Sequence, residues 1–78
     1  MEIKEEIFLD QFISQFNTEP MGVTIDTDFR DIDDWDSLTA LGVISMIDDE
    51  YNVKLSGEEL KSSKSVRDIF NIVKTKLS

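Results

Sequence analysis

The residues best placed to do chemistry lie in the stretch Asp34-Trp35-Asp36-Ser37-Leu38, near the middle of the chain. The Ser37 hydroxyl is suited either to act as a nucleophile or to receive a covalent group. A nucleophilic serine needs an adjacent base held by a third group, and the 78 residues include no histidine. No spacing supplies a lysine or carboxylate base. We therefore interpret Ser37 as a point of covalent modification and expect that the chain is not an enzyme. The plainer alternative is that Ser37 only caps a helix.

Composition narrows the other kinds of chemistry. The absence of cysteine excludes disulfides, thiolate metal sites and a cysteine nucleophile. Residues 26–31 begin like a calcium loop, which needs an oxygen ligand at position 5, glycine at 6 and glutamate at 12. Arg30, Asp31 and Ser37 occupy those positions, so no metal site is predicted. An enzyme based on carboxylates stays an alternative that would need convergent acids of raised pKa.

The charge balance indicates the kind of partner. The chain has 8 basic and 17 acidic residues, a net charge of −9. This disfavours nucleic acids and anionic membrane surfaces, which attract basic patches, and favours proteins with basic surfaces. Residues 1–6 are too acidic for a secretory signal, and no apolar run approaches the roughly 20 residues of a membrane span. We expect a cytoplasmic monomer.

Apolar periodicity predicts where the helices lie. A first helix is expected over residues 3–16, with Ile3, Ile7, Phe8, Phe12, Ile13 and Phe16 on its apolar face. A long loop over residues 17–36 follows, and Phe29 and Ile32 are expected to insert into the core. The second helix should run from Ser37 to about Tyr51, capped by Asp36 or Ser37.

The C-terminal third completes a small all-α four-helix bundle. Ser56 and Glu59 have the spacing of a capping box and predict a short third helix. Ser65 is expected to cap a last helix that ends near Leu77. Gly42, inside the second helix, suggests close approach by another element. Residues 1–78 are thus expected to form one domain with three longer helices and one short one.

Asp36-Ser37-Leu38, in a small acidic chain with this order of helices, resembles the acyl carrier proteins and the related peptidyl carrier domains. The resemblance covers essentially the whole chain. Other positions that match the family pattern are Phe29, Leu41, Val43, Ile47, Tyr51 and Val66. In that family the serine carries a 4′-phosphopantetheine arm whose thiol holds an acyl or aminoacyl thioester.

The resemblance also implies partners and a docking surface. A phosphopantetheinyl transferase would move the arm from coenzyme A to Ser37 with magnesium. Acyl-transferring, condensing or ligating enzymes with basic patches would then dock on the second helix. The positions that correspond to docking contacts are Asp36, Leu38, Leu41, Asp48 and Asp49.

Several positions depart from the pattern of the carriers used in fatty acid synthesis. Thr39 and Gly42 stand where those proteins usually have an acidic pair, and Asp34-Trp35 replaces a small pair that usually includes glycine. Ser45 and Ser63 replace apolar residues near the acyl pocket, which suggests a shallower or more polar pocket. The departures favour a discrete carrier of a specialised pathway, or one of several carriers in the cell.

A different class of function is also compatible with the sequence. An acidic helical interaction module without a prosthetic group would bind basic partners through Asp48, Asp49 and Glu50. These three carboxylates lie at the end of the second helix that the helix dipole disfavours for negative charge. The two hypotheses differ in whether Ser37 is modified.

Overall fold

The computed structural model describes residues 3–17 and 20–77. These residues form α1 (Glu5–Ile13), the 3₁₀ turn η1 (Phe29–Asp31), α2 (Ser37–Tyr51), α3 (Gly57–Ser62) and α4 (Val66–Leu77). The predicted all-α fold, with three longer helices and one short helix, is confirmed. Within the described ranges, no helix is long and apolar enough to cross a membrane.

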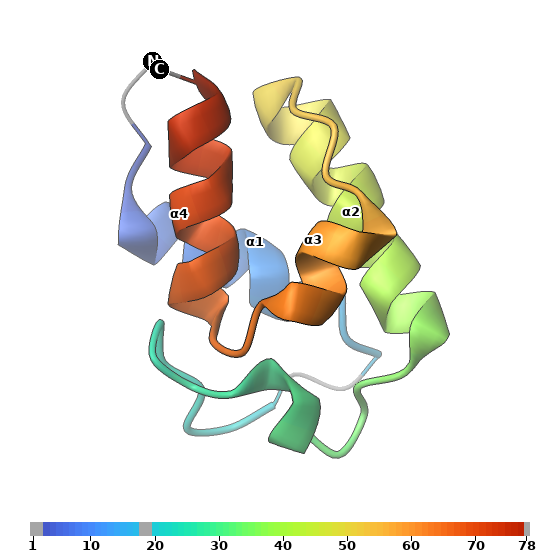
Figure 1. Ribbon diagram of the computed structural model, residues 1–78. Coiled ribbons are helices and arrows are strands. Elements are labelled where there is room, and N and C mark those ends of the chain that lie inside the picture. The colour runs from blue at the N-terminus through green and yellow to red at the C-terminus, as the bar shows by residue number, and fades with distance from the viewer. Residues whose placement is uncertain (1–2, 18–19, 78) are drawn as a thin grey trace.

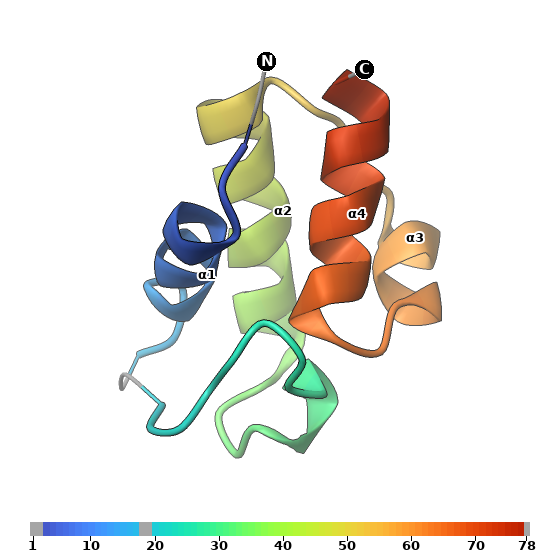
Figure 2. The ribbon, with the colours of Figure 1, turned by 90° about the vertical axis from the view of Figure 1, so that its left-hand side faces the viewer.

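The helices are arranged so that α2 and α4 begin at the same end of the molecule (Figures 1 and 2). α1 runs in the opposite direction, and the short α3 lies beside α4. The segment that contains η1 passes beneath the starts of α2 and α4. The long loop therefore closes the end of the bundle at which Ser37 lies.

α1 is shorter than the sequence predicted. It ends at Ile13, not at residue 16, and Ile7 on its predicted apolar face is 52% exposed. Phe8 and Phe12 are fully buried, so the buried stripe of α1 is narrower than the apolar pattern. Phe16 is still buried, although it lies in a turn after α1 in which the Gln15 and Phe16 amides donate to the Phe12 and Ile13 carbonyls.

The core is built from the inner faces of the helices and one residue of the loop. Aromatic contacts join α1 to its neighbours: the Phe8 ring lies 5.5 Å from Phe70 and 5.9 Å from Tyr51, between centroids. The fully buried side chains of largest volume are Phe8, Phe12, Phe29, Ile47, Ile69, Val43, Val66 and Val73. Ile32 packs partly buried against this core, as expected for a loop held in place by its apolar residues.

Backbone hydrogen bonds hold the long loop to the connection between α3 and α4. The Phe29 amide donates to the Lys64 carbonyl at 3.3 Å, and the Val66 amide donates to the Thr27 carbonyl at 3.2 Å. An isolated antiparallel bridge joins Asp28 to Ser65. The loop is therefore ordered by contacts made far away in the sequence rather than by a local pattern.

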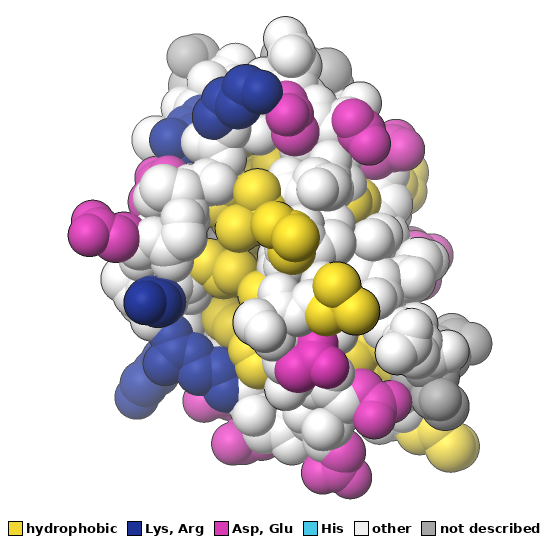
Figure 3. Space-filling view, turned by 90° about the vertical axis from the view of Figure 1, so that its right-hand side faces the viewer, with side chains coloured by type: hydrophobic (Ala, Val, Ile, Leu, Met, Phe, Trp, Pro, Cys, Tyr) yellow, Lys and Arg dark blue, Asp and Glu magenta, His cyan; other side chains and the backbone are white. Residues whose placement is uncertain are grey.

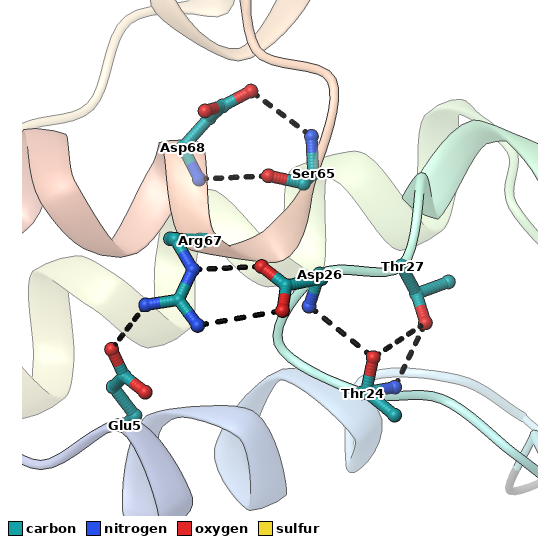
Figure 4. Close-up of polar contacts among 7 residues, drawn as sticks. All are labelled: Glu5, Thr24, Asp26, Thr27, Ser65, Arg67 and Asp68. Atoms are coloured by element: carbon teal, nitrogen blue, oxygen red, sulfur yellow. Dashed lines mark hydrogen bonds and ion pairs between the residues drawn. The ribbon is translucent and has the colours of Figure 1, made fainter.

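Arg67, near the start of α4, adds a side-chain anchor for the same loop. Its guanidinium lies 2.7 Å from Asp26 Oδ1 and 2.5 Å from Glu5 Oε2 (Figure 4). Its backbone amide also donates to the Ile25 carbonyl at 2.7 Å. One cation thus links α1, the loop and α4, and both carboxylates raise the pKa of Arg67, Asp26 more strongly.

The starts and ends of the later helices follow local signals. The capping box of Ser56 and Glu59 is present, with 3.0 Å hydrogen bonds in both directions. Ser65 Oγ accepts a bond from the Asp68 amide at the start of α4 (Figure 4). Gly42 lies where an added Cβ would come within 3.3 Å of Gln15 Oε1, so the predicted close approach is confirmed.

We expect Phe29→Ala to destabilise the fold because Phe29 is only 1% exposed. Truncation of a core phenylalanine costs about 3–5 kcal/mol, which urea denaturation would measure. Met21→Ala is the control: Met21 is in the same loop but is 96% exposed, and surface substitutions stay within about 0.5 kcal/mol. Equal stability of the two variants would contradict the anchoring role of Phe29.

Candidate functional site

Ser37 is the first residue of α2, and its side chain is exposed. Asp36 is the N-cap: its backbone is extended, and its Oδ1 accepts a hydrogen bond of 2.8 Å from the Thr39 amide. The cap is therefore Asp36 rather than Ser37, and this leaves the Ser37 hydroxyl outside the capping bond. The hydrogen bond from the Thr39 amide is also the main reason why the pKa of Asp36 is lowered.

Thr39 has a structural role that the sequence did not indicate. It is buried, and its hydroxyl donates to the Asp34 carbonyl at 3.2 Å. Together with the hydrogen bond from its amide to Asp36 Oδ1, this ties the segment just before Ser37 to the first turn of α2. Thr39 is thus turned away from the surface on which the resemblance had placed an acidic residue.

An open apolar cleft of about 660 Å³ begins at Ser37 and extends between α2 and α3. Its lining residues are Phe29, Arg30, Trp35, Asp36, Ser37, Ala40, Leu41, Ile44, Gly57, Leu60 and Lys61. Figure 3 shows this face of the molecule, with apolar side chains gathered at its centre and basic side chains along the left of the hollow. The cleft is therefore accessible to a flexible group attached at Ser37.

Trp35 joins the cleft to the aromatic part of the core. Its ring centroid lies 4.6 Å from that of Phe29 in an edge-on contact. The Phe12 and Phe16 rings are each 6.1 Å away, the former stacked and the latter tilted. Such pairs are worth about 0.5–1.5 kcal/mol beyond their burial. The packing of Trp35 thus fixes the chain just before the Asp36 cap against the core.

Arg30 positions α3 against the loop at the other side of the cleft. Its guanidinium donates to the carbonyls of Lys61 and Ser63, the latter at 2.9 Å. These carbonyls lie at the C-terminal end of α3, where a cation is favourable. Its partners are 31 and 33 residues away in sequence, so no local pattern could have identified this role.

The predicted docking residues divide into an apolar pair and two acidic positions. Leu38 and Leu41 are 71% and 60% exposed, and their spacing of three places them on one helix face. Asp48 lies farther along that face and pairs with Lys54 at 2.8 Å. Asp49 is exposed. A basic partner would therefore compete with Lys54 for Asp48.

The expectation that Ser45 and Ser63 make the pocket shallower or more polar is not borne out by the cleft. Neither residue lines it. Ser63 is buried, but its hydroxyl donates to the Glu59 carbonyl at 2.9 Å. Ser45 is exposed on α2. The fixed helical geometry turns Ser45 outward, and the bond to Glu59 turns the Ser63 hydroxyl away from the cleft.

The acidic side chains bear differently on the two alternative functions. Asp48 and Asp49, two of the three acids assigned to an interaction module, are also docking positions of the carrier, so they do not separate these two hypotheses. Glu50, the third, accepts a hydrogen bond from the Gln11 side-chain Nε2 at 3.3 Å. In the described ranges, the carboxyl groups with a shifted pKa all have it lowered by hydrogen bonds: Asp26, Asp36, Glu59 and Asp68. A carboxylate acting as a general acid would need the opposite shift.

A small helical fold that presents an exposed serine at the start of a central helix, beside an apolar cleft, has the arrangement of a carrier domain. A family model described as "Phosphopantetheine attachment site" matches residues 6–73. The chain is also similar to the solution structure of a holo acyl carrier protein from Geobacter metallireducens, with 30% identity and a TM-score of 0.75. That match covers 92% of this chain and 83% of the other.

The chain therefore belongs to the phosphopantetheine attachment family and is a carrier protein of the acyl carrier type. Its cofactor is a covalently attached phosphopantetheine. The described residues fit this group, because an exposed hydroxyl lies at a helix N-terminus, where phosphate is favoured, and opens onto the apolar cleft.

We expect the capping contribution of Asp36 to depend on pH. Its pKa is lowered in the folded state, from about 3.9 in unfolded chains. The stabilisation is therefore complete above that value and is lost as the pH falls through the folded pKa. The melting-temperature difference between wild type and Asp36→Ala should shrink in that range.

Asp36→Asn is the matched control, because asparagine caps helices about as well as aspartate without titrating. Its melting temperature should exceed that of Asp36→Ala by an amount that stays constant over the same pH range. A difference between wild type and Asp36→Ala that persists unchanged to the lowest pH would contradict the role of the charged cap.

Proposed function

We propose that Ser37 is the attachment point of the phosphopantetheine arm and that the protein tethers acyl or aminoacyl intermediates as thioesters. The observation that carries this proposal is the exposed position of Ser37 at the first turn of α2, at the mouth of the cleft. The carrier itself performs no catalysis. It delivers its cargo to enzymes of fatty acid, polyketide or related specialised biosynthesis, as one domain over residues 1–78 in the cytoplasm.

Attachment is a phosphoryl-group transfer in which Ser37 supplies the acceptor oxygen. A phosphopantetheinyl transferase binds coenzyme A with magnesium and removes the proton from the Ser37 hydroxyl. The bond from Oγ to phosphorus forms as the pyrophosphate bond of coenzyme A breaks, and the adenosine bisphosphate leaves. The positive end of α2 stabilises the negative phosphodiester on Ser37.

The cleft would then shelter the attached cargo. Six of its lining residues are apolar or aromatic and surround the space that begins at Ser37: Phe29, Trp35, Ala40, Leu41, Ile44 and Leu60. Burial of an acyl chain there removes apolar surface from water, about 0.8 kcal/mol for each methylene. An open cleft also lets the chain leave again when a partner enzyme takes it.

Partner enzymes would dock beside the cleft, on the outer face of α2. Leu38 and Leu41 supply exposed apolar contacts, and Asp36, Asp48 and Asp49 supply negative charge around them. This combination suits a partner with an apolar patch inside a basic rim, whose approach is accelerated by the net charge of −9. Delivery thus uses the same helix that positions the arm.

We expect Ser37→Ala to abolish the modification. The protein would be incubated with coenzyme A and a broad-specificity phosphopantetheinyl transferase, and its intact mass measured. Wild type should gain one phosphopantetheinyl group. Ser45→Ala is the matched control, since Ser45 is also exposed on α2, and it should gain the same mass. Modification of Ser37→Ala, or none of wild type across several transferases, would refute the proposed site.

We expect Leu38→Ala to weaken docking without changing the fold. Leu38 is exposed in the free protein, and burial of a leucine is worth about 1.5–3 kcal/mol. The kcat/KM of the transferase should therefore fall by about tenfold or more. Ile7→Ala is the control, because Ile7 is exposed on α1, and it should react at the wild-type rate. Equal losses in both variants would argue against docking on α2.

A further inference from the structure

Two aromatic rings of the cleft lining also contact the aromatic core. Phe29 and Trp35 line the cleft, whereas Phe12 and Phe16 do not. Phe12 and Phe16 are buried in the core and contact the Trp35 ring. The indole of Trp35 therefore touches both the open cleft and the closed aromatic core.

Phe29 and Trp35 are held in place by different contacts. Phe29 is fixed by its burial and by the hydrogen bond from its amide to the Lys64 carbonyl. Trp35 is half-buried, and its amide donates to the Ile32 carbonyl at 2.9 Å. Its side chain is held by packing against the core, with ring contacts to Phe12, Phe16 and Phe29. Removal of this side chain would open the cleft toward Phe12 and Phe16.

We infer that Trp35 is a specificity-determining residue: its indole separates the cleft from the aromatic core and limits how far an acyl chain can enter. This inference rests on the proposed function, because it requires a cargo attached at Ser37. Chains up to the limiting length are sheltered completely, whereas the remainder of a longer chain stays in solvent. The length of chain that the cleft shelters is thus set by Trp35 rather than by Ser45 or Ser63, neither of which lines it.

The test uses apo protein that a broad-specificity phosphopantetheinyl transferase converts with straight-chain acyl-coenzyme A from acetyl to dodecanoyl. The whole acyl-phosphopantetheine group is transferred to Ser37, adenosine bisphosphate leaves, and intact mass verifies each product. The melting temperature should rise with chain length and then level off. In Trp35→Ala the levelling should move to chains longer by at least about two methylenes, since each newly buried methylene adds stability. Trp35→Phe, which keeps a smaller ring against the core, should give an intermediate shift.

Phe16→Ala is the matched control, because Phe16 contacts Trp35 from the core and does not line the cleft. It should lower the melting temperature of every species but leave the levelling length as in wild type. Trp35 is also the only tryptophan, so its emission should shift to shorter wavelength in wild type as the acyl chain grows, up to the same length.

Each contrary result has a separate meaning. An unchanged levelling length in both Trp35 variants, or an equal shift in Phe16→Ala, would overturn the role of Trp35. The wild-type protein could also load normally but show no change of melting temperature or tryptophan emission with chain length. That result would overturn the role of Trp35 and leave the carrier function intact. Failure of wild type to load at all would refute the carrier function and this inference with it.

Discussion

The position of Ser37 depends on the packing of Phe29 and Trp35 against the core. The long loop has no periodic structure of its own, and these two rings fix it to the aromatic residues of α1. Backbone hydrogen bonds to the connection between α3 and α4 then fix where the loop lies at the end of the bundle. Because the loop ends at Asp36, the same contacts determine where α2 begins and where the Ser37 hydroxyl is presented.

The cations of the chain serve the fold as well as the surface. Arg67 links two carboxylates from different segments, and Arg30 holds the end of α3. Lys54 and Lys76 pair with Asp48 and Glu59. Because these basic groups interact with groups of the same chain, the negative charge near the start of α2 is available to attract basic partners. Surface pairs of this kind add little stability individually, so their main effect is on the shape of the electrostatic field.

The sequence predicted those features that depend on local signals. α2 runs from Ser37 to Tyr51 as expected, and the capping box at Ser56 is present, because both are encoded within a few residues. The end of α1 was predicted wrongly, since Phe16 continues the apolar period although a turn, not a helix, carries it to the core.

The parts of the site that were missed are those made by distant contacts. Trp35 was noted only as a departure from the family pattern, and its place between cleft and core depends on the rings of Phe12 in α1 and of Phe16 after it. Arg30 was considered only as a residue that breaks a calcium loop, while its carbonyl partners follow it by more than 30 residues. Ser63 was assigned to the pocket, but its hydrogen bond to the Glu59 carbonyl is decided by the geometry of α3.

The central claim is that Ser37 carries the arm in the working protein. The most direct test is to isolate the protein from its own organism, measure its intact mass and map the modified peptide by fragmentation. The account predicts phosphopantetheine, with any cargo still attached, on the peptide that contains Ser37. Protein that is unmodified, or modified at another residue, would contradict it.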